Sequence, residues 1–386
     1  MEIRETARNC AAFAALQSVY ENRDAAVSAW RAEGKKIVAK LGCDVPDELL
    51  LAAGLMPVQV YADPERPLVN TDQYLEFAFD PVVRAQFEKI VDGTYAGLAD
   101  YLAVSNSTDV IIRTYLYLRE LHRVEPERKL PELAFIDWLF TRNRLHQVRN
   151  EHTMQIFRAQ VEEWAGRPVT DEQIEDAARV CNADRAALRR IGELRRAGRI
   201  SGTEALVIIG SSMFMDRARH AELTNAVADE AAQWPELTGV RVFVTGSNQE
   251  DLNLYAKLEK AGALVVGEDF DWGDRYYGRD YDLSLPPIRA LVDCYMLREF
   301  SSKKAFVSQR VEALEREIDA VDAQAVVFYS NIYEEAASWD YPSQKKMLDG
   351  RGIPSVNFCK MTYPVETNDG LDEALSAFVA GVKGGC

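Results

Sequence analysis

The sequence predicts an α/β fold with two parallel-sheet domains of the flavodoxin or Rossmann type and an additional helical part. Short apolar runs alternate with amphipathic segments in both halves of the chain, a pattern that implies parallel sheets. The stretch between the halves has Arg and Glu three or four residues apart, as on a solvated helical face. The 386 residues suffice for two or three domains with cores of their own.

We therefore expect four parts. They are a helical N-terminal segment (1–40), a first α/β domain (41–165), a helical linker region (166–235) and a second α/β domain (236–386). In the N-terminal segment, residues 11–16 and 25–30 place apolar side chains at helical spacing.

The first α/β domain begins with a short helix that Pro46 and Gly54 bracket. A strand at 58–61, a helix over 81–99 and a strand at 101–104 follow. The loop 105–109 then leads into a helix over 110–122, and a strand at 133–136 precedes a long helix at 144–164. This alternation predicts the first parallel sheet.

The linker region is expected to be helical over 170–228, with the apolar run 205–210 as a buried helix. The second domain has expected strands at 241–245, 263–267, 325–329 and 355–358. Its expected helices cover 251–261, 286–300, 304–321, 344–348 and 371–382. The same alternation predicts a second parallel sheet.

Composition excludes several classes of function. The chain carries 45 basic and 61 acidic residues, a net charge of −16, which disfavours nucleic-acid binding. It has no apolar stretch long enough to cross a membrane, and its first residues do not resemble a signal peptide. Six scattered cysteines without a CxxC pair indicate a reducing cytoplasm.

Four loops follow expected strands at their carboxyl ends, where open parallel sheets bind ligands: 105–109, 246–248, 268–275 and 330–340. The turn Gly246-Ser247-Asn248 is either a phosphate cradle or a plain turn. The segment 268–277 combines four carboxylates with aromatic side chains and one Arg, which suits either a planar substrate or a charged surface turn. None of the four histidines falls in these loops, so neither a His-based zinc site nor a Ser–His–Asp triad is predicted.

Motifs along nearly the whole chain resemble those of the 2-hydroxyacyl-CoA dehydratase and benzoyl-CoA reductase family. They are Gly42-Cys43-Asp44-Val45-Pro46, Ala52-Ala53-Gly54-Leu55-Met56-Pro57, Asn106-Ser107-Thr108-Asp109, Ser201-Gly202-Thr203, Gly267-Glu268-Asp269, Gly273-Asp274-Arg275-Tyr276 and Gly352-Ile353-Pro354. The stretch 339–346 and the chain's size are similar to the smaller, substrate-side (C-type) subunit of ATP-dependent benzoyl-CoA reductase.

The resemblance implies an enzyme of two related subunits, each commonly with a 4Fe-4S cluster on three cysteines. It also implies separate ATP-hydrolysing iron–sulfur activator subunits, with ferredoxin as the indirect electron donor. The main prediction is an oxidoreductase subunit that reduces the ring of benzoyl-CoA, or a related aromatic acyl-CoA, to a cyclic dienoyl-CoA in anaerobic aromatic degradation. The alternatives are a subunit of a radical 2-hydroxyacyl-CoA dehydratase and a cluster-free scaffold subunit of such a complex.

The chain departs from the family pattern at the cluster. Cys43 is the one predicted metal ligand, because the second family cysteine would fall at Thr108 and the third near Asp271. Neither Thr nor Asp is a normal ligand of an iron–sulfur cluster, which is held by thiolates. Three possibilities remain: a cluster with unusual ligands, a cluster held partly by the partner subunit, or no cluster in this subunit.

The predicted site residues come from the carboxyl-end loops and the family motifs. The reaction needs a desolvated ring and a nearby proton donor. The predicted catalytic residues are Asp271, Asp274 and Tyr276. The predicted substrate-binding residues are Thr108, Asp109, Trp272, Arg275 and Asn331, of which Thr108 and Asn331 are expected to hydrogen-bond the thioester carbonyl.

Overall fold

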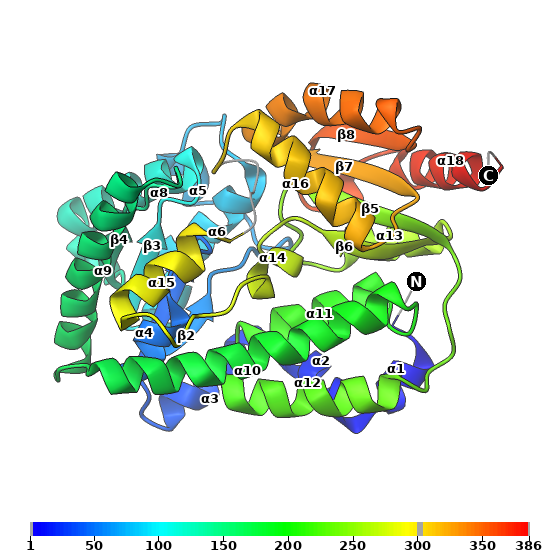
Figure 1. Cartoon of the computed structure of the whole chain (residues 1–386). Helices are drawn as coiled ribbons and strands as arrows, with labels where there is room; N and C mark the ends of the chain where they lie inside the picture. The colour runs from blue at the N-terminus through cyan, green and yellow to red at the C-terminus, as the bar shows by residue number, and fades with distance from the viewer. Residues whose placement is uncertain (1–2, 299–303, 385–386) are drawn as a thin grey trace.

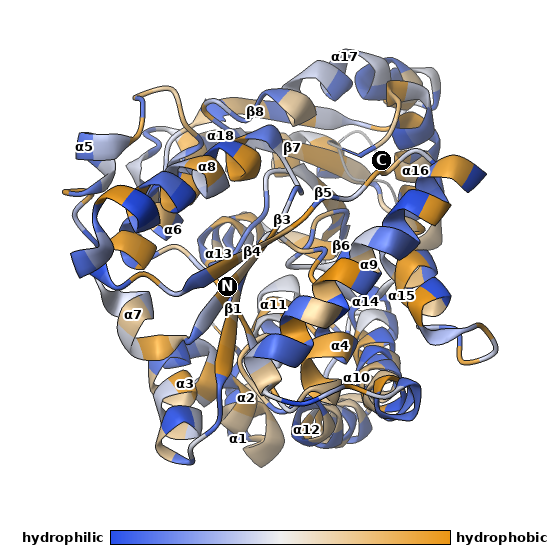
Figure 2. Ribbon diagram, turned by 90° about the vertical axis from the view of Figure 1, so that its left-hand side faces the viewer, coloured by the Kyte–Doolittle hydropathy of each residue, from blue (hydrophilic) through white to orange (hydrophobic). Residues whose placement is uncertain are grey.

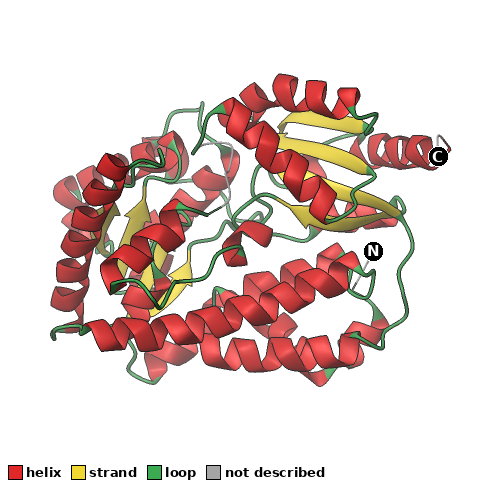
Figure 3. Ribbon diagram, in the orientation of Figure 1, coloured by secondary structure: helices red, strands yellow, loops and turns green. Residues whose placement is uncertain are grey.

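The protein is described here by a computed structural model, which covers residues 3–298 and 304–384. These residues form two four-stranded parallel sheets with helices around them, which confirms the predicted α/β class (Figures 1 and 3). The first sheet has the order β2-β1-β3-β4 and the second the order β6-β5-β7-β8. Each half therefore places its strands in the same order relative to its own sequence.

The first sheet consists of β1 (Ile37–Leu41), β2 (Met56–Gln59), β3 (Tyr101–Ser105) and β4 (Glu132–Ile136). The expectation that residues 1–40 are helical is wrong for β1, a central strand. Lys40 interrupts the apolar run in the sequence, but its amine pairs with the Asp47 carboxylate, so the strand is buried along its length. The expected boundary at residue 40 falls inside β1.

Helices cover both faces of the first sheet. One face packs against α4 (Asp47–Ala52), α9 (Arg144–Ala165) and α15 (Pro287–Met296), and the other against α3 (Arg23–Ala32), α6 (Pro81–Val91) and α8 (Asp109–Val124). The helix expected over 81–99 is divided, because Gly93 turns the backbone with φ 95° before α7 (Thr94–Leu98). The strand expected at 58–61 begins earlier, and its Pro57 is tolerated because β2 lies at the sheet edge.

The linker region is helical as predicted, with α10 (Asp171–Arg196), α11 (Gly202–Ser212) and α12 (Arg217–Ala231). They pack with α1 (Glu5–Asn9) and α2 (Ala11–Glu21) into one layer of helices below both sheets (Figure 1). Capping boxes begin two of these helices, with Thr170 at α10 and Ser201 at α11. Every residue of α11 is buried, which confirms the buried helix expected at 205–210.

The second sheet consists of β5 (Val240–Gly246), β6 (Ala263–Glu268), β7 (Ala325–Asn331) and β8 (Ser355–Met361). One face packs against α11, α13 (Asn253–Lys260) and α18 (Leu371–Gly384), and the other against α16 (Val307–Ala320) and α17 (Glu335–Gly350). The helix expected at 344–348 begins at Glu335 instead, because α17 continues through Pro342. The expected loop 330–340 is shortened accordingly.

The remaining elements are short: α5 (Thr71–Tyr74), α14 (Asp274–Tyr277) and the 3-10 turns η1 (Pro126–Arg128) and η2 (Val365–Thr367). The helix expected at 286–300 corresponds to α15, and residues 299–300 lie outside the described residues. The helix expected from 304 begins at Val307. No helix in the described part of the chain is both long and apolar enough to cross a membrane.

The two halves share a core. The largest cluster of buried apolar side chains contains Ala39 and Val104 of the first sheet together with Val242 and Val327 of the second. Figure 2 shows the strands as mainly apolar and the surrounding helices as two-faced. The pairing of α15 with α9 also returns a segment from the second half to the first sheet.

Candidate functional site

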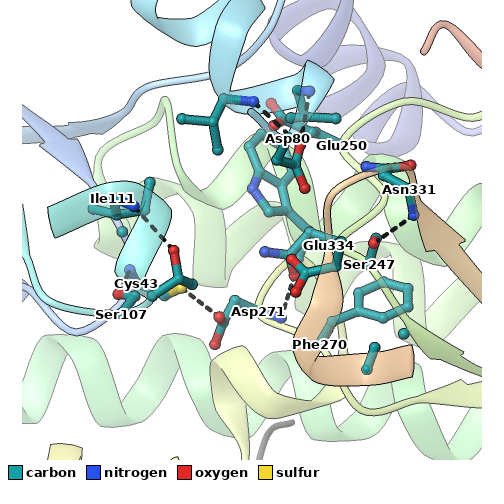
Figure 4. A pocket seen from close by; sticks show the side chains of 18 of the residues that line it. Cys43, Asp80, Ser107, Ile111, Ser247, Glu250, Phe270, Asp271, Asn331 and Glu334 are labelled. Carbon is teal, nitrogen blue, oxygen red and sulfur yellow. Dashed lines mark hydrogen bonds between the residues drawn. The ribbon is translucent and has the colours of Figure 1, made fainter. Parts of the chain in front are cut away.

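A pocket lies where the carboxyl ends of the two sheets meet. In each sheet the strand order reverses at one point, between β1 and β3 in the first and between β5 and β7 in the second. Such switch points are where open α/β sheets bind ligands. The pocket takes one lining residue from each of the four loops at these points: Cys43, Thr108, Ser247 and Asn331 (Figure 4). Both sheets therefore contribute to one site.

A glycine turns the chain sharply after the first strand of each half. Gly42 has φ +88°, and a Cβ there would lie 2.5 Å from the Ser105 hydroxyl oxygen. Gly246 has φ +125°, and a Cβ there would lie 2.2 Å from the Tyr329 carbonyl oxygen. Both positions require glycine for conformation and for space. The turns bring the following loop residues over the ends of the neighbouring strands.

Equivalent hydrogen bonds fix the residue after each glycine. The Cys43 backbone N–H donates to Ser107 Oγ at 3.2 Å, across from β1 to the loop after β3. Ser247 Oγ accepts from the Asn331 backbone N–H at 3.0 Å, across from β5 to the end of β7 (Figure 4). The two switch points are therefore built alike, although the residues at equivalent places differ.

The Cys43 side chain belongs to a buried network, called here the Cys43 network, of Cys43, Asp44, Asp271, Arg275 and Lys304. The Cys43 thiol donates to the Asp271 carboxylate (Figure 4), which also pairs with Arg275. Arg275 reaches Asp44 at 3.4 Å, and Lys304 pairs with Asp44 as well. Asp44 is fully buried, and Arg275 and Lys304 are nearly so. Two carboxylates and two cations thus balance one another around one thiol.

Electrostatics agree with this hydrogen-bond direction. Burial, and then the Asp271 charge, raises the pKa of the Cys43 thiol, which keeps it protonated. Burial alone would raise the pKa of Asp271, but Arg275 and Lys304 hold it below its ordinary value. The pair is therefore a thiol donor and a charged carboxylate acceptor.

These residues do not fit a 4Fe-4S cluster. The Thr108 hydroxyl oxygen accepts from the Ile111 N–H at 3.1 Å as the N-cap of α8, and Asp271 is ion-paired. Cys10, Cys181, Cys294 and Cys359 lie on other elements and do not line the pocket; Cys386 falls outside the described residues. Among the described residues, no three His, Cys, Asp or Glu side chains are grouped as a metal site. One protonated thiol is too few soft ligands for a cluster.

Tyr276 is held by a hydrogen-bonded chain on the far side of its ring. Ser212 Oγ donates to Asp184 Oδ2 at 2.9 Å, and Asp184 also bonds Nδ1 of the fully buried His220. The single Ser212 proton is thus used, so the Tyr276 hydroxyl, at 3.2 Å, is the donor to Ser212. The phenol proton points away from the pocket. His220 was interpreted as an ordinary helical residue, and sequence reasoning missed this chain.

Two carboxyl groups in the pocket titrate near neutral pH. Asp269 accepts from the Thr245 hydroxyl at 2.6 Å, and burial raises the pKa of Asp269 to about 7. Glu250 accepts from Gln86 Nε2 at 2.7 Å and from the Ala62 N–H at 2.8 Å. Burial likewise raises the pKa of Glu250 to about 7. Both are acids that can exchange a proton at physiological pH.

Neither carboxyl was among the predicted site residues. Asp269 carried a signal, because it follows an expected strand within the carboxyl-end loop 268–275. Both groups also bear on the turn 246–248, for which a phosphate cradle and a plain turn were open. Glu250 and Asp269 line the pocket beside this turn, and their carboxyls disfavour an anion there.

The structure brings six of the predicted site residues into the pocket and leaves three out of it. Those that line it are Cys43, Thr108, Asp271, Trp272, Tyr276 and Asn331. Asp109 begins α8 with its side chain 85% exposed, at 3.8 Å from Arg113. Asp274 accepts from Arg195 at 2.8 Å on the other side of α14. Arg275 lies behind Asp271, within the Cys43 network.

Basic residues near the second switch point were also missed. Lys304 and Arg310 line the pocket, and Arg310 pairs with the buried Asp340. Both cations come from the start of α16 and the residues before it, which no strand-end rule singles out. Their contribution depends on tertiary packing.

Comparisons with known proteins agree with the motifs. A family model described as 2-hydroxyglutaryl-CoA dehydratase, D-component, matches residues 43–379. The chain is 24% identical to the (R)-phenyllactyl-CoA dehydratase beta subunit of Clostridium sporogenes, over 84% of this chain and 86% of that protein. It is 22% identical to the (R)-2-hydroxyglutaryl-CoA dehydratase beta subunit of Acidaminococcus fermentans, over 88% of this chain and 91% of that protein.

A third relative is the C-type subunit of the benzoyl-CoA reductase of Thauera aromatica, 18% identical over 89% of this chain and 91% of that protein. All three relatives are single subunits by name, and each is matched over most of its length. Since the family model covers most of the 386 residues, the chain belongs to the 2-hydroxyglutaryl-CoA dehydratase D-component family, as its motifs predicted.

Proposed function

We propose that this chain is a subunit of a 2-hydroxyacyl-CoA dehydratase that works with a related partner subunit and a separate ATP-hydrolysing activator. This was the alternative to the main prediction, a benzoyl-CoA reductase subunit. Identity to the two dehydratase beta subunits, 24% and 22%, exceeds the 18% identity to the reductase subunit. The observation that carries the proposal is the pocket between the facing switch points, which is lined by six predicted site residues.

The walls of the pocket suit an acyl group. Apolar side chains from both halves line it, namely Val82, Val83, Ile111, Phe270 and Trp272. Packing an acyl chain against such walls removes water from the reacting carbons. Loss of water from that environment strengthens every polar contact made to the thioester.

The polar residues of the pocket have distinct roles in this proposal. The Thr108 oxygen accepts the cap hydrogen bond, so its hydroxyl proton remains to donate to the thioester carbonyl. The Asn331 amide is a second donor on the facing side. Elimination of water needs a base for a carbon-bound hydrogen and an acid for the departing hydroxyl. Asp269, with its pKa raised by burial to about 7, suits either task.

The test is an anaerobic assay of the complex of this chain with its partner subunit and activator, supplied with ATP and a low-potential reductant. (R)-phenyllactyl-CoA, (R)-2-hydroxyglutaryl-CoA and benzoyl-CoA are offered separately, and the products are identified by mass spectrometry. We expect a 2-enoyl-CoA from at least one hydroxyacyl-CoA and no product from benzoyl-CoA. A cyclic dienoyl-CoA from benzoyl-CoA would contradict the proposal and restore the main prediction.

A variant at the pocket tests the assigned role. Asp269→Asn should lower kcat by about 100-fold or more, because the amide neither takes nor gives a proton. Asp229→Asn is the control, since that side chain is 72% exposed and pairs with Arg190 at the surface. Equal activity of the two variants would remove Asp269 from the mechanism.

A further inference from the structure

The three positions where the family resemblance places cluster ligands lie together in this fold. Cys43, Thr108 and Asp271 come from different loops, and all three line the same pocket. We infer that this chain holds no iron–sulfur cluster of its own, and that the Cys43 network joins the two halves of the molecule at that place. The inference concerns the metal content of the chain and is independent of which acyl-CoA it serves.

The donor atoms at this place are already engaged. The Cys43 sulfur is in hydrogen-bond contact with an Asp271 oxygen, so the space between the first and third positions is filled by their own side chains (Figure 4). The Thr108 oxygen is turned to the N-terminus of α8 at 3.1 Å from the Ile111 nitrogen. Carboxylate and hydroxyl oxygens are hard donors, whereas cluster iron is held by thiolates.

Other thiols do not complete a ligand set. Cys10 lies at the end of α1, Cys181 in α10 and Cys294 in α15, all buried within packed helices. Cys359 is exposed on β8. None of these four lines the pocket. Cys43 is therefore the single thiol that the described residues present at the expected cluster position.

The network makes the connection that a shared metal centre would make. Asp44 belongs to the loop after β1 in the first half, whereas Asp271 and Arg275 belong to the loop after β6 and to α14 in the second. Arg275 reaches across to Asp44 at 3.4 Å, and the guanidinium of Arg298 donates to the Cys43 carbonyl oxygen at 3.1 Å. Buried charges of both signs that are paired in this way hold their loops in one geometry.

The experiment measures metal rather than turnover. The chain, alone and in complex with its partner subunit, is purified anaerobically and incubated with ferrous iron and sulfide. Iron, acid-labile sulfide and absorbance near 400 nm are then determined for the natural sequence and for Cys43→Ala. We expect the lone chain to contain less than about 0.5 iron atom, and the iron content of the complex to be the same with either form.

About four iron atoms in the lone chain, or loss of iron from the complex on Cys43→Ala, would overturn the inference. The second outcome detects a cluster shared with the partner subunit. A gain-of-metal variant adds a positive arm: Thr108→Cys with Asp271→Cys supplies three thiols to one pocket and should take up about four iron atoms. Thr108→Ala with Asp271→Ala is its matched control and should take up none.

If the double cysteine variant does not fold, the Cys43→Ala comparison still decides the question. Failure of the proposed function would show in the product analysis, which uses the natural complex. The metal content of the chain does not depend on that result, so the two proposals fail separately.

Discussion

Arg275 lies between two buried carboxylates and contacts both. Its side chain is 3% exposed, and it pairs with Asp271 and with Asp44. Removing this cation leaves two carboxylates with Lys304 as the remaining cation of the Cys43 network. A buried charge that loses its partner costs about 3–5 kcal/mol. We expect Arg275→Met to lower the free energy of unfolding by that amount in urea titrations.

The control for this prediction is Arg190→Met. Arg190 pairs with Asp229 at 2.6 Å, but both side chains are exposed. Exposed pairs contribute about 0–1 kcal/mol, so this variant should unfold nearly as the natural protein does. Similar losses for both variants would show that the Cys43 network does not stabilise the fold.

Glu250 predicts a pH dependence of stability. Burial raises its pKa from 4.5 to about 7 in the folded chain. Below pH 4.5 the carboxyl is protonated in both states; as pH rises toward 7 the unfolded chain ionises first, which lowers the free energy of unfolding. Above pH 7 this cost is about 3 kcal/mol. Glu250→Gln removes it, so its Tm relative to the natural protein should rise between pH 5 and pH 8.

Thermal unfolding followed at several pH values checks this expectation. The absolute Tm of Glu250→Gln also reflects the altered hydrogen bonds to Gln86 and Ala62, so the change of the difference with pH is the relevant quantity. A difference in Tm that is the same at pH 5 and pH 8 would contradict the pKa given above.

At this scale the sequence predicted which loops form the site better than which side chains enter it. Asp271 and Asp274 both lie in the expected loop 268–275, yet Asp271 faces the pocket and Asp274 faces Arg195. Their directions depend on the one-turn helix α14, whose packing no spacing rule gives. Lys304 and Glu250 were missed because tertiary contacts alone bring them to the pocket.

Among the elements, the turn after β5 depends most directly on one residue. Gly246 combines φ +125° with a potential Cβ only 2.2 Å from the Tyr329 carbonyl oxygen. We expect Gly246→Ala to cost at least about 2 kcal/mol, because both backbone strain and a contact with main chain oppose it. The free energy of unfolding, measured in urea, checks this.

Gly350→Ala is the matched substitution. Gly350 ends α17, has no other atom within 4 Å of its potential Cβ and needs no left-handed backbone. Alanine there should be neutral or stabilising by at most about 1 kcal/mol. Comparable destabilisation by both substitutions would mean that the loss at Gly246 is not due to its conformation.

The elements that sequence patterns missed have physical reasons. Lys40 made β1 look unlike a buried strand, since a lone Lys is rarely buried without a partner, and the partner Asp47 became visible only in the fold. Pro342 suggested a helix boundary, but α17 continues through it. Helices with a clear apolar stripe, such as α8 and α9, matched their expected positions within a few residues.

For the whole molecule, the shared core predicts cooperative unfolding. The largest apolar cluster takes side chains from both sheets and from the helices between them, and the Cys43 network links loops of both halves. We expect one thermal transition by calorimetry, with calorimetric and van't Hoff enthalpies in agreement. Arg275→Met should lower that transition without dividing it. Two separate transitions would show that the halves unfold independently.

The strand–helix alternation was enough to predict two parallel sheets, because each apolar run of strand length had a helix on either side of it. It did not predict that α15 would pack against α9 of the first half. Partner choice between distant helices depends on complementary surfaces rather than on periodicity. The same limit applies to the pocket, whose walls come from loops of both halves.

The equal strand order of the two sheets has a consequence for the direction in which a ligand binds. A molecule held between two sets of loops built alike meets the same backbone from either side, so the backbone by itself does not distinguish its head from its tail. Orientation must come from unequal side chains at equivalent places. Cys43 after Gly42 and Ser247 after Gly246 are such a pair.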